Sequence, residues 1–313
     1  IKLVEIVGAG RSGSTLLDIL LGGFDDAIAV GELRFIWTRG VLYDQLCGCS
    51  SSLTQCDFWK KVFADLQLPD LQAAAEQRAH VAATVDRLRY FSKYLASGSR
   101  GQLPKEVKQY AEDEWALVQS IARVSGRSII VDSSKYPGRA LAFAMHPEIR
   151  QHLYVIHLAR DARAVAHSWT RRKRRTEINT HVEYMPRHGV ASSSGLWMAL
   201  NYASQKLRKQ VVDGRYRFLR YEDLTASPER YIGELAQWLG VKDSVEQVIN
   251  HASVDEIHHT VSGNPLRFEG IGEVRPDLRW QREMSGFSQL TATLIAWPLL
   301  RRYRYFSRQD KRS

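Results

Sequence analysis

A glycine-rich turn near the N-terminus has the composition of an anion-binding loop. The spacing Gly8-x-x-x-x-Gly13-x-Thr15 follows an apolar run and precedes an amphipathic helical pattern. Glycines let the backbone approach a phosphate, and the first N–H groups of the helix and its dipole point at that phosphate. The spacing is that of a P-loop, but Ser14 stands where nucleoside triphosphatases carry a lysine, and Arg11 is the cation instead. The loop is therefore predicted to bind phosphate without the usual grip on β and γ phosphates.

Four more polar residues directly follow predicted strands. Apolar runs predict strands at residues 2–7, 27–30, 128–132, 152–158 and 216–220. Alternation of these runs with helical patterns predicts a parallel, doubly wound sheet, whose ligands bind at the carboxyl ends of the strands. Together with Arg11 in the loop, Glu32, Lys135, Arg160 and Tyr221 are expected at that edge. Five polar groups that converge on one crevice predict a binding site.

The segments GRSGSTLL (10–17) and VGELR (30–34) resemble the 5′-phosphosulfate loop of the sulfotransferases. These enzymes transfer a sulfuryl group from 3′-phosphoadenosine-5′-phosphosulfate (PAPS) and release PAP. The resemblance is strongest to the branch with tyrosylprotein sulfotransferases and many bacterial enzymes. It implies a sulfotransferase acting by in-line displacement on a hydroxyl of a sugar, lipid, peptide or natural product.

The resemblance implies two phosphate sites for PAPS. The 5′ end would bind at the loop residues Gly10, Arg11, Ser12, Gly13, Ser14 and Thr15. The 3′ phosphate would bind Arg160, Ser168 eight residues later, and Arg172, which we place one helical turn beyond Ser168. Arginine suits this task because its fork offers several donors to phosphate oxygens. The rest of the basic run 171–175 is interpreted mainly as a solvated face.

Further nucleotide contacts follow from the same resemblance. Tyr221 lies where the family contacts adenine, although it could equally be a packed aromatic at a strand end. The segments 262–268 and 277–280 are similar to the family's closing loop. Within them, Asn264, Arg267 and Arg279 are candidate phosphate contacts.

Three residues are candidates for the chemistry of transfer. Arg11 and Lys135 could stabilise charge on the departing 5′ phosphate, so that fixed cations replace the Mg²⁺ of kinases and no metal is required. Glu32 resembles the catalytic glutamate of the tyrosylprotein branch and is the candidate base. Asp132, which ends the neighbouring strand, is the alternative base. Glu32 could instead be a structural partner of Arg34.

The pattern predicts a P-loop-containing three-layer α/β/α fold with a central parallel sheet. We expect a single sulfotransferase domain over residues 1–313 with a helical insert at about 57–124. Insertions over strand ends shape pockets there, so the insert is expected to contribute to acceptor specificity. Residues 33–43 are expected to be helical.

Three cysteines lie close together, at positions 47, 49 and 56. An odd number gives no disulfide framework, and a zinc site would need a fourth ligand from elsewhere. We interpret Cys47, Cys49 and Cys56 as a reduced, buried turn and expect no metal.

Composition restricts the partners. The net charge of +10 implies an anionic ligand or surface, not specifically nucleic acid. A nucleic-acid-binding protein is disfavoured because the basic run lacks interleaved aromatics. A P-loop kinase is the alternative enzyme, disfavoured by the missing lysine.

No apolar run is long enough to span a bilayer, and no signal peptide is visible. We expect a cytoplasmic protein, although an N-terminal segment or anchor could precede Ile1.

Overall fold

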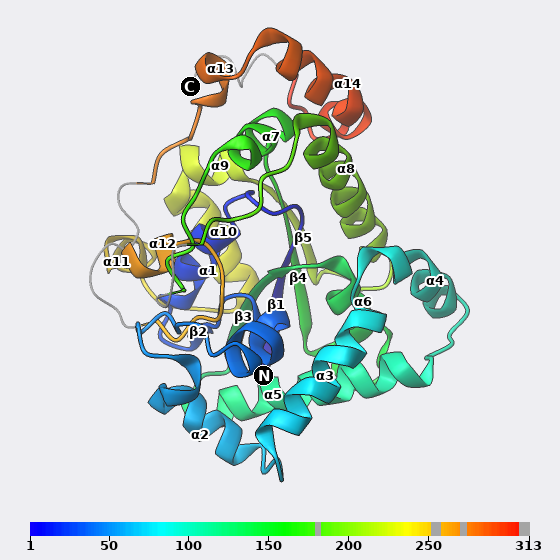
Figure 1. Ribbon diagram of the computed structural model, residues 1–313, viewed down its shortest axis with the longest axis vertical. Coiled ribbons are helices and arrows are strands. Elements are labelled where there is room, and N and C mark those ends of the chain that lie inside the picture. Colours follow the sequence, from blue (N-terminus) through cyan, green and yellow to red (C-terminus); the bar gives the residue numbers. More distant parts are fainter. Residues whose placement is uncertain (179–182, 252–257, 270–273, 307–313) are drawn as a thin grey trace.

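Five parallel strands form the central sheet of the computed structural model, which describes residues 1–178, 183–251, 258–269 and 274–306 (Figure 1). The strands are β1 (Lys2–Val7), β2 (Ala27–Ala29), β3 (Ile129–Lys135), β4 (Leu153–Ala159) and β5 (Tyr216–Arg220). Their spatial order is β2-β3-β1-β4-β5. Near-continuous apolar runs form these strands because both faces of the sheet are covered. The predicted fold class is confirmed.

The central position of β1 places the glycine-rich turn between two other strand ends. β1 pairs with β3 on one side and with β4 on the other. The chain therefore leaves β1 at the point where the strand order reverses, which is where ligands bind in such sheets. Lys135 at the end of β3 and Arg160 just after β4 flank the turn.

Helices cover the two faces of the sheet. One apolar cluster joins alternate residues of β1 to the first face, which carries α1 (Ser14–Gly22), α9 (Tyr221–Ala226), α10 (Pro228–Leu239) and α11 (Val245–His251). The second cluster joins the other β1 residues to α6 (Pro137–Met145) and to the insert helices α2 (Asp57–Asp65), α3 (Leu71–Val85), α4 (Leu88–Ser99) and α5 (Lys105–Ser125). The predicted helical insert is thus present and packs as part of the main core.

The remaining helices lie mostly near the carboxyl edge of the sheet. They are α7 (Ala162–Thr170), α8 (Val190–Leu207), α12 (Leu266–Glu269), α13 (Trp280–Glu283) and α14 (Gly286–Arg302). α7, α8 and α14 pack together above the end of the sheet (Figure 1). None of the helices in the described ranges is both long and apolar enough to cross a membrane.

The predicted helix at residues 33–43 has unusual geometry. It begins as a 3₁₀ turn at Leu33–Phe35 and continues as a π-helix at Ile36–Leu42. π-Helical turns are rare and often occur at functional sites. Short 3₁₀ turns also occur at Leu53–Gln55 and Ile149–Gln151.

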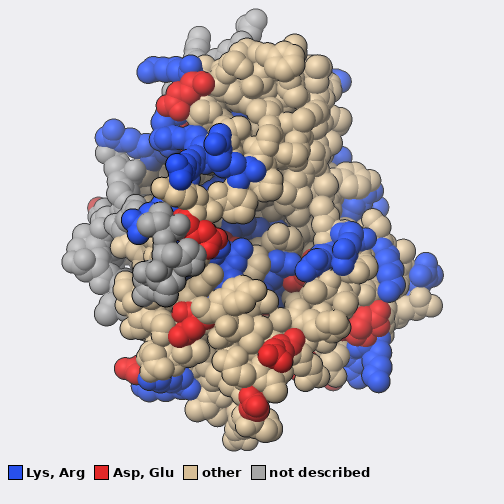
Figure 2. Space-filling view, in the orientation of Figure 1, with Lys and Arg blue, Asp and Glu red and all other residues tan. Residues whose placement is uncertain are grey.

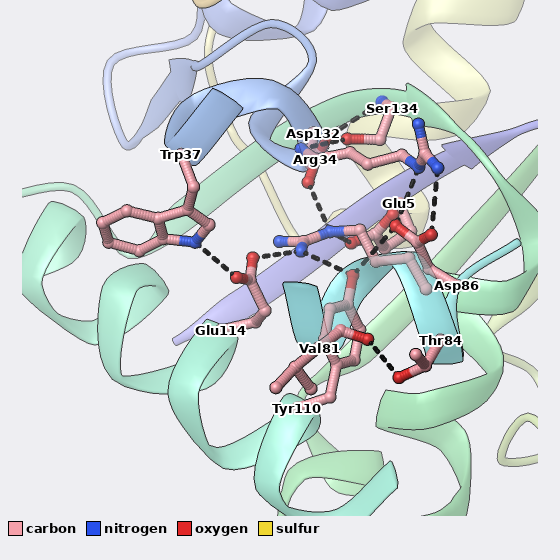
Figure 3. A network of polar contacts seen from close by, with 11 residues as sticks. Glu5, Arg34, Trp37, Val81, Thr84, Asp86, Tyr110, Glu114, Asp132 and Ser134 are labelled. Carbon is pink, nitrogen blue, oxygen red and sulfur yellow. Dashed lines mark hydrogen bonds and ion pairs between the residues drawn. The ribbon is translucent and has the colours of Figure 1, made fainter. Parts of the chain in front are cut away.

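A buried charge network joins the insert to the sheet (Figure 3). Arg139 of α6 is fully buried and donates from Nε to Glu5 of β1 and Asp132 of β3, each at 3.0 Å. Its Nη1 donates to Glu114 of α5, which also accepts a 2.7 Å hydrogen bond from the indole of Trp37. One cation thus faces three carboxylates, and burial raises the pKa of Glu5 well above its usual value.

Arg34 extends the same network toward the segment that carries Glu32. Its Nε lies 2.7 Å from the carboxylate of Asp86, at the end of α3. The backbone N–H of Arg34 donates to the hydroxyl of Ser134 in β3 at 3.0 Å. The insert, β3 and the chain after Glu32 are therefore fixed relative to one another.

Candidate active site

Two residues of the glycine-rich turn, Gly8 and Gly13, have positive φ angles and no space for a Cβ. Gly8 has φ +140°, and a Cβ there would lie 2.3 Å from the carbonyl oxygen of Leu158 in β4. Gly13 has φ +88°, and its Cβ would lie 2.4 Å from the ring of Tyr221. Gly13 is also the N-cap of α1, so no side chain covers the first N–H groups of that helix. The turn is shaped to accept an anion at the helix N-terminus.

A cavity of about 640 Å³ opens beside this turn at the carboxyl edge of the sheet, in the size range of ligand pockets. Lysine and arginine side chains gather in and around the hollow on the face drawn in Figure 2. Of the predicted site residues, the cavity is lined by Gly10, Arg11, Gly13, Ser14, Thr15, Glu32, Lys135, Arg160, Ser168, Tyr221, Asn264 and Arg279. The structure therefore brings together twelve residues from segments far apart in the sequence.

Glu32 and Lys135 form an ion pair inside the cavity. Lys135 Nζ lies 2.5 Å from Glu32 Oε1, and both side chains are largely shielded from solvent. Lys135 has φ +72°, which aims its side chain across the end of the sheet toward Glu32. The alternative pairing of Glu32 with Arg34 is wrong, since Arg34 pairs with Asp86.

Arg11 is held at the rim of the same cavity. Its φ is +68°, a conformation that costs energy for a residue with a side chain. The guanidinium lies 4.9 Å from the ring centroid of Trp169 and donates to Met185 Sδ at 2.8 Å. Burial lowers the pKa of Arg11 from its usual value. A bound anion near Arg11 would offset this loss of hydration by a favourable charge interaction.

Arg160 lies on the opposite side of the turn, after β4. It is 8% exposed and donates to the Arg11 carbonyl and to the Asp277 carbonyl, each at 3.2 Å. Its guanidinium carbon lies 4.6 Å from the ring centroid of Tyr221. Arg160 Nε is buried without a hydrogen-bond partner in the described part of the chain, so the site has donor capacity left for a ligand. Ser168 lines the same cavity from α7.

The geometry of this cavity agrees with the family comparison. The profile of the Sulfotransferase family matches residues 4–245 of the chain. The chain belongs to the sulfotransferase family. As a member it is an enzyme that transfers a sulfuryl group from PAPS. The buried cations and unpaired donors around the turn fit a ligand with two anionic ends.

Solved structures place this sulfotransferase among similar folds. The sulfotransferase domain of the Synechococcus PCC 7002 olefin synthase is 20% identical, with 96% of this chain and 94% of that domain covered and a TM-score of 0.53. The sulfotransferase domain of the curacin biosynthetic pathway is 16% identical, with 94% and 97% covered and a TM-score of 0.46. Retinol dehydratase in complex with retinol and PAP is 14% identical, with 96% and 81% covered and a TM-score of 0.41. The first of these supports the fold. A comparison with curated protein sequences gave no significant match.

Three predicted phosphate contacts of the sulfotransferase, Ser12, Arg172 and Arg267, lie outside the cavity lining. α7 ends at Thr170, so the premise that Arg172 lies one helical turn beyond Ser168 is wrong. Arg172 stacks instead on the ring of Tyr184, 3.6 Å from its centroid. Arg267 is 4% exposed and donates to the backbone carbonyls of Thr260 and Leu46, so it holds loops together.

Two further predicted contacts line the cavity, and Ser12 is buried next to it. Asn264 and Arg279 line the cavity, and Arg279 donates two hydrogen bonds to the carboxylate of Asp277. These bonds lower the pKa of Asp277, which also lies 3.2 Å from Arg160. Ser12 is buried, and its hydroxyl has no partner among the described residues. It does not line the cavity itself.

Asp132 cannot serve as the alternative base. It is fully buried, accepts from Arg139 at 3.0 Å and from the Ser134 backbone at 2.8 Å, and does not line the cavity. The backbone of β3 explains the difference, because its pairing with β1 is irregular between Asp132 and Lys135, and Lys135 has φ +72°. Asp132 points into the network beneath the insert, whereas Lys135 points over the sheet edge.

The basic run contributes more than the sequence suggested. Arg171, Lys173 and Arg175 line the cavity. Arg171, Arg172 and Arg174 are exposed, as expected for a solvated face, so that interpretation is wrong only for the partly buried Lys173 and Arg175. Backbone hydrogen bonds from the Met185 N–H to the Lys173 carbonyl and from the Arg175 N–H to the Glu183 carbonyl, both at 2.8 Å, pair residues 173–175 with 183–185 in an antiparallel arrangement. In extended chain alternate residues share a face. Residues 171, 173 and 175 can therefore share one face. The sequence does not show that this segment is extended, whereas its pairing with residues 183–185 does.

The insert does not line the cavity. No residue between 57 and 124 is in its wall, so the expected contribution of the insert to the pocket is wrong. The helices of the insert instead contribute buried apolar side chains to the core on one face of the sheet. The wall beside Glu32 and Lys135 comes from Phe35, Arg39 and Tyr136 instead. These residues follow β2 and β3 closely in sequence, and their position could have been inferred from that.

Proposed function

We propose that this sulfotransferase transfers the sulfuryl group to a hydroxyl acceptor with Glu32 as the general base and Arg11 and Lys135 as the charge-stabilising cations. The acceptor oxygen attacks sulfur, the bond between sulfur and the 5′-phosphate oxygen breaks, and Glu32 takes the hydroxyl proton. The observation that carries this proposal is the contact between Glu32 and Lys135 beside the glycine-rich turn, in one cavity. A carboxylate and an ammonium group are thus adjacent in the cavity where we propose that sulfur passes from the leaving oxygen to the acceptor oxygen.

The nucleotide is proposed to lie along the turn. The N–H groups of Gly13, Ser14 and Thr15 face the 5′ phosphate, and Arg160 with Ser168 holds the 3′ phosphate. Arg160 is suited to this role because its Nε is buried without a partner in the described chain and its Nη atoms are already oriented by two carbonyls. Fixed donors of this kind stabilise developing charge without reorganisation.

Tyr221, Asn264 and Arg279 are proposed to close over the nucleotide. Tyr221 lines the cavity and its ring lies against both Gly13 and Arg160, so it is placed between the two proposed phosphate sites. Arg279 is more than half exposed at its side chain, which fits a group that covers a ligand from outside. Lys173 and Arg175 line the same cavity and add positive charge to it.

The acceptor is proposed to enter beside Phe35 and Tyr136. Both line the cavity, next in sequence to the Glu32 and Lys135 segments, and they place aromatic surface next to the proposed base. Sugars stack on such rings, and apolar alcohols pack against them.

We propose a cytoplasmic enzyme, since three free cysteines suit a reducing compartment.

The test is transfer of labelled sulfate from PAPS to a panel of sugars, lipid alcohols, tyrosyl peptides and natural-product alcohols. We expect label in at least one hydroxyl class, and loss of that label with the Glu32→Gln variant. Label transferred from γ-labelled ATP instead of PAPS would overturn the proposal. Labelling of amines but not hydroxyls would overturn the assigned acceptor class.

A further inference from the structure

Three cysteines and one histidine from distant parts of the chain meet at a single point. The Sγ atoms of Cys47, Cys49 and Cys56 and one ring nitrogen of His259 all lie within 4.8 Å of one another. Cys56 Sγ is 3.2 Å from His259 Nδ1, Cys47 Sγ is 3.9 Å from the same nitrogen, and Cys49 Sγ is 3.6 Å from Cys56 Sγ. His259 is the fourth ligand that the sequence did not reveal.

We propose that these four residues bind a structural zinc ion. Zinc takes four ligands tetrahedrally, with bonds of about 2.3 Å to sulfur and 2.0–2.1 Å to nitrogen, so neighbouring ligand atoms lie roughly 3.5–3.8 Å apart. Three of the separations, 3.2, 3.6 and 3.9 Å, lie close to that spacing, and all four atoms are within 4.8 Å of one another. A disulfide does not explain them, because bonded sulfurs lie about 2.05 Å apart and all three cysteines are free. The expectation of no metal at the cysteines is therefore replaced.

The surroundings of the cluster orient its ligands. The indole N–H of Trp59 donates to the His259 carbonyl at 3.0 Å, and Phe58 stacks on the imidazole with ring centroids 4.8 Å apart. Cys47 and Cys56 are buried. Supporting contacts of this kind fix the ligands of a metal site. Four protein ligands leave no open position, which is the pattern of a structural site.

The backbone at Gly48 packs closely against the segment 258–260, which carries His259. A Cβ at Gly48 would lie 2.4 Å from the His258 carbonyl oxygen. The Gly48 N–H donates to the Thr260 carbonyl at 3.0 Å. Close packing of these backbones brings the cysteine loop and His259 within ligand distance.

The proposed zinc acts at a distance from the reaction. None of the four ligands lines the active-site cavity. The chain continues from His259 to Val261, whose N–H donates to the Val30 carbonyl at 2.8 Å and whose carbonyl accepts from the Glu32 N–H at 2.7 Å. The metal would therefore anchor the segment that fixes the backbone of Glu32. It supplies no chemistry to sulfuryl transfer.

The first test is elemental analysis of the full chain, purified under reducing conditions in zinc-containing medium. We expect about one tightly held zinc per chain, and a thiolate-to-metal charge-transfer band with tetrahedral d–d bands after exchange for cobalt. Zinc well below stoichiometric in protein that still binds PAP would overturn the proposal. So would a Cys49–Cys56 disulfide found by mass spectrometry in that reduced, PAP-binding protein.

The second test uses variants with a matched control. His259→Ala and Cys49→Ser should lose most of the metal and lower the melting temperature by more than about 5 °C. His259→Cys keeps a zinc-binding donor and should retain metal, and His80→Ala, at an exposed histidine, should behave like the wild type. If the first two variants fail to fold, zinc release from the wild-type protein should coincide with its thermal unfolding. Full metal retention by His259→Ala, or zinc release well before unfolding with no change in stability, would sink the proposal.

Discussion

At the scale of single residues, the active site is defined by the partner that each charged group has. Glu32 and Lys135 contact each other inside the cavity. Asp132, three residues before Lys135, is instead buried against Arg139. Two carboxylates that looked equivalent candidates in the sequence thus have different environments, and only Glu32 faces space where an acceptor can bind.

Glu32→Gln keeps the size of the side chain and removes its basicity. We expect kcat to fall by roughly 10²–10⁴-fold while PAP affinity changes little, since a general base acts on the acceptor. The measurements are kcat and the PAP dissociation constant on the same preparation, with Glu76→Gln at an exposed site as control. Parallel loss of PAP affinity would mean that Glu32 acts by holding Lys135. Unchanged turnover would remove Glu32 from the mechanism.

Arg160 and Arg172 form a matched pair for the 3′-phosphate site. Arg160→Ala should weaken PAP binding roughly 10- to 100-fold, because a hydrogen bond to a charged group contributes about 1.5–3 kcal/mol. Arg172→Ala should weaken it much less, since its guanidinium stacks on Tyr184 and does not line the cavity. Isothermal titration of PAP into both variants measures the difference. Equal losses in the two would contradict the placement described above.

At the scale of elements, buried ionisable groups join helices to the sheet. Arg139 connects α6, β1, β3 and α5 through three carboxylates. Glu222, the second residue of α9, accepts the Asp161 N–H at the start of α7 and the hydroxyl of Tyr305, each at 2.9 Å. Such contacts fix the strand ends on which the site depends.

Removal of Arg139 would leave three buried carboxylates without their shared cation. Breaking a buried ion network from one side typically costs about 3–5 kcal/mol, so Arg139→Met should lower the free energy of unfolding by that order. Arg123→Met removes a mostly exposed pair with Asp65 and should cost at most about 1 kcal/mol. Urea unfolding of both variants gives the comparison. A smaller loss for Arg139 than for Arg123 would contradict the proposed role of the network.

Glu222 should make stability depend on pH. Burial raises the pKa of Glu222 from 4.5 to about 7, so the folded state binds its proton more tightly than the unfolded state. This contribution is complete below the unfolded value of 4.5 and is lost as pH rises through the folded value of about 7. Relative to wild type, Glu222→Gln should gain up to about 3 kcal/mol at alkaline pH and nothing at acidic pH. Thermal unfolding of both proteins across this range checks it. Parallel curves would refute the assignment.

At the scale of the whole molecule, the excess of positive charge converges on one cavity. The net charge is +10, and Arg11, Lys135, Lys173 and Arg175 all line that hollow. Charge focused in a cleft raises the local concentration of an anionic substrate. No metal is required in this family, and we propose that the fixed cations around the turn supply the positive charge for the transfer step.

Ligand-induced stabilisation should therefore distinguish nucleotides. PAP at one hundred times its dissociation constant should stabilise the protein by about 2.7 kcal/mol, whereas ATP with Mg²⁺ should do much less, because Ser14 replaces the lysine that grips a γ phosphate. Differential scanning fluorimetry with each ligand measures this.

Turnover should also be unchanged without added Mg²⁺. Equal thermal shifts, or an absolute Mg²⁺ requirement, would contradict the mechanism.

Much of the molecule could be predicted from local sequence. Apolar runs predicted all five strands, and the glycine spacing predicted the anion-binding turn after β1, because strand periodicity and turn geometry depend on neighbouring residues. The position of Glu32, Lys135 and Arg160 at one edge then followed from parallel pairing. The family, the use of PAPS and the fold class were confirmed.

Tertiary structure decided what side chains outside regular elements do. Arg172 and Arg267 were assigned to phosphates by sequence, yet one stacks on a tyrosine and the other holds backbone carbonyls. His259 joins Cys56 across 203 positions, a contact that no local pattern contains. Strand and turn formation depend on short-range sterics, whereas the direction of a loop side chain depends on which distant segment packs against it. The sequence alone therefore determined where the candidate site lies, and packing determined which of its candidate residues line the cavity.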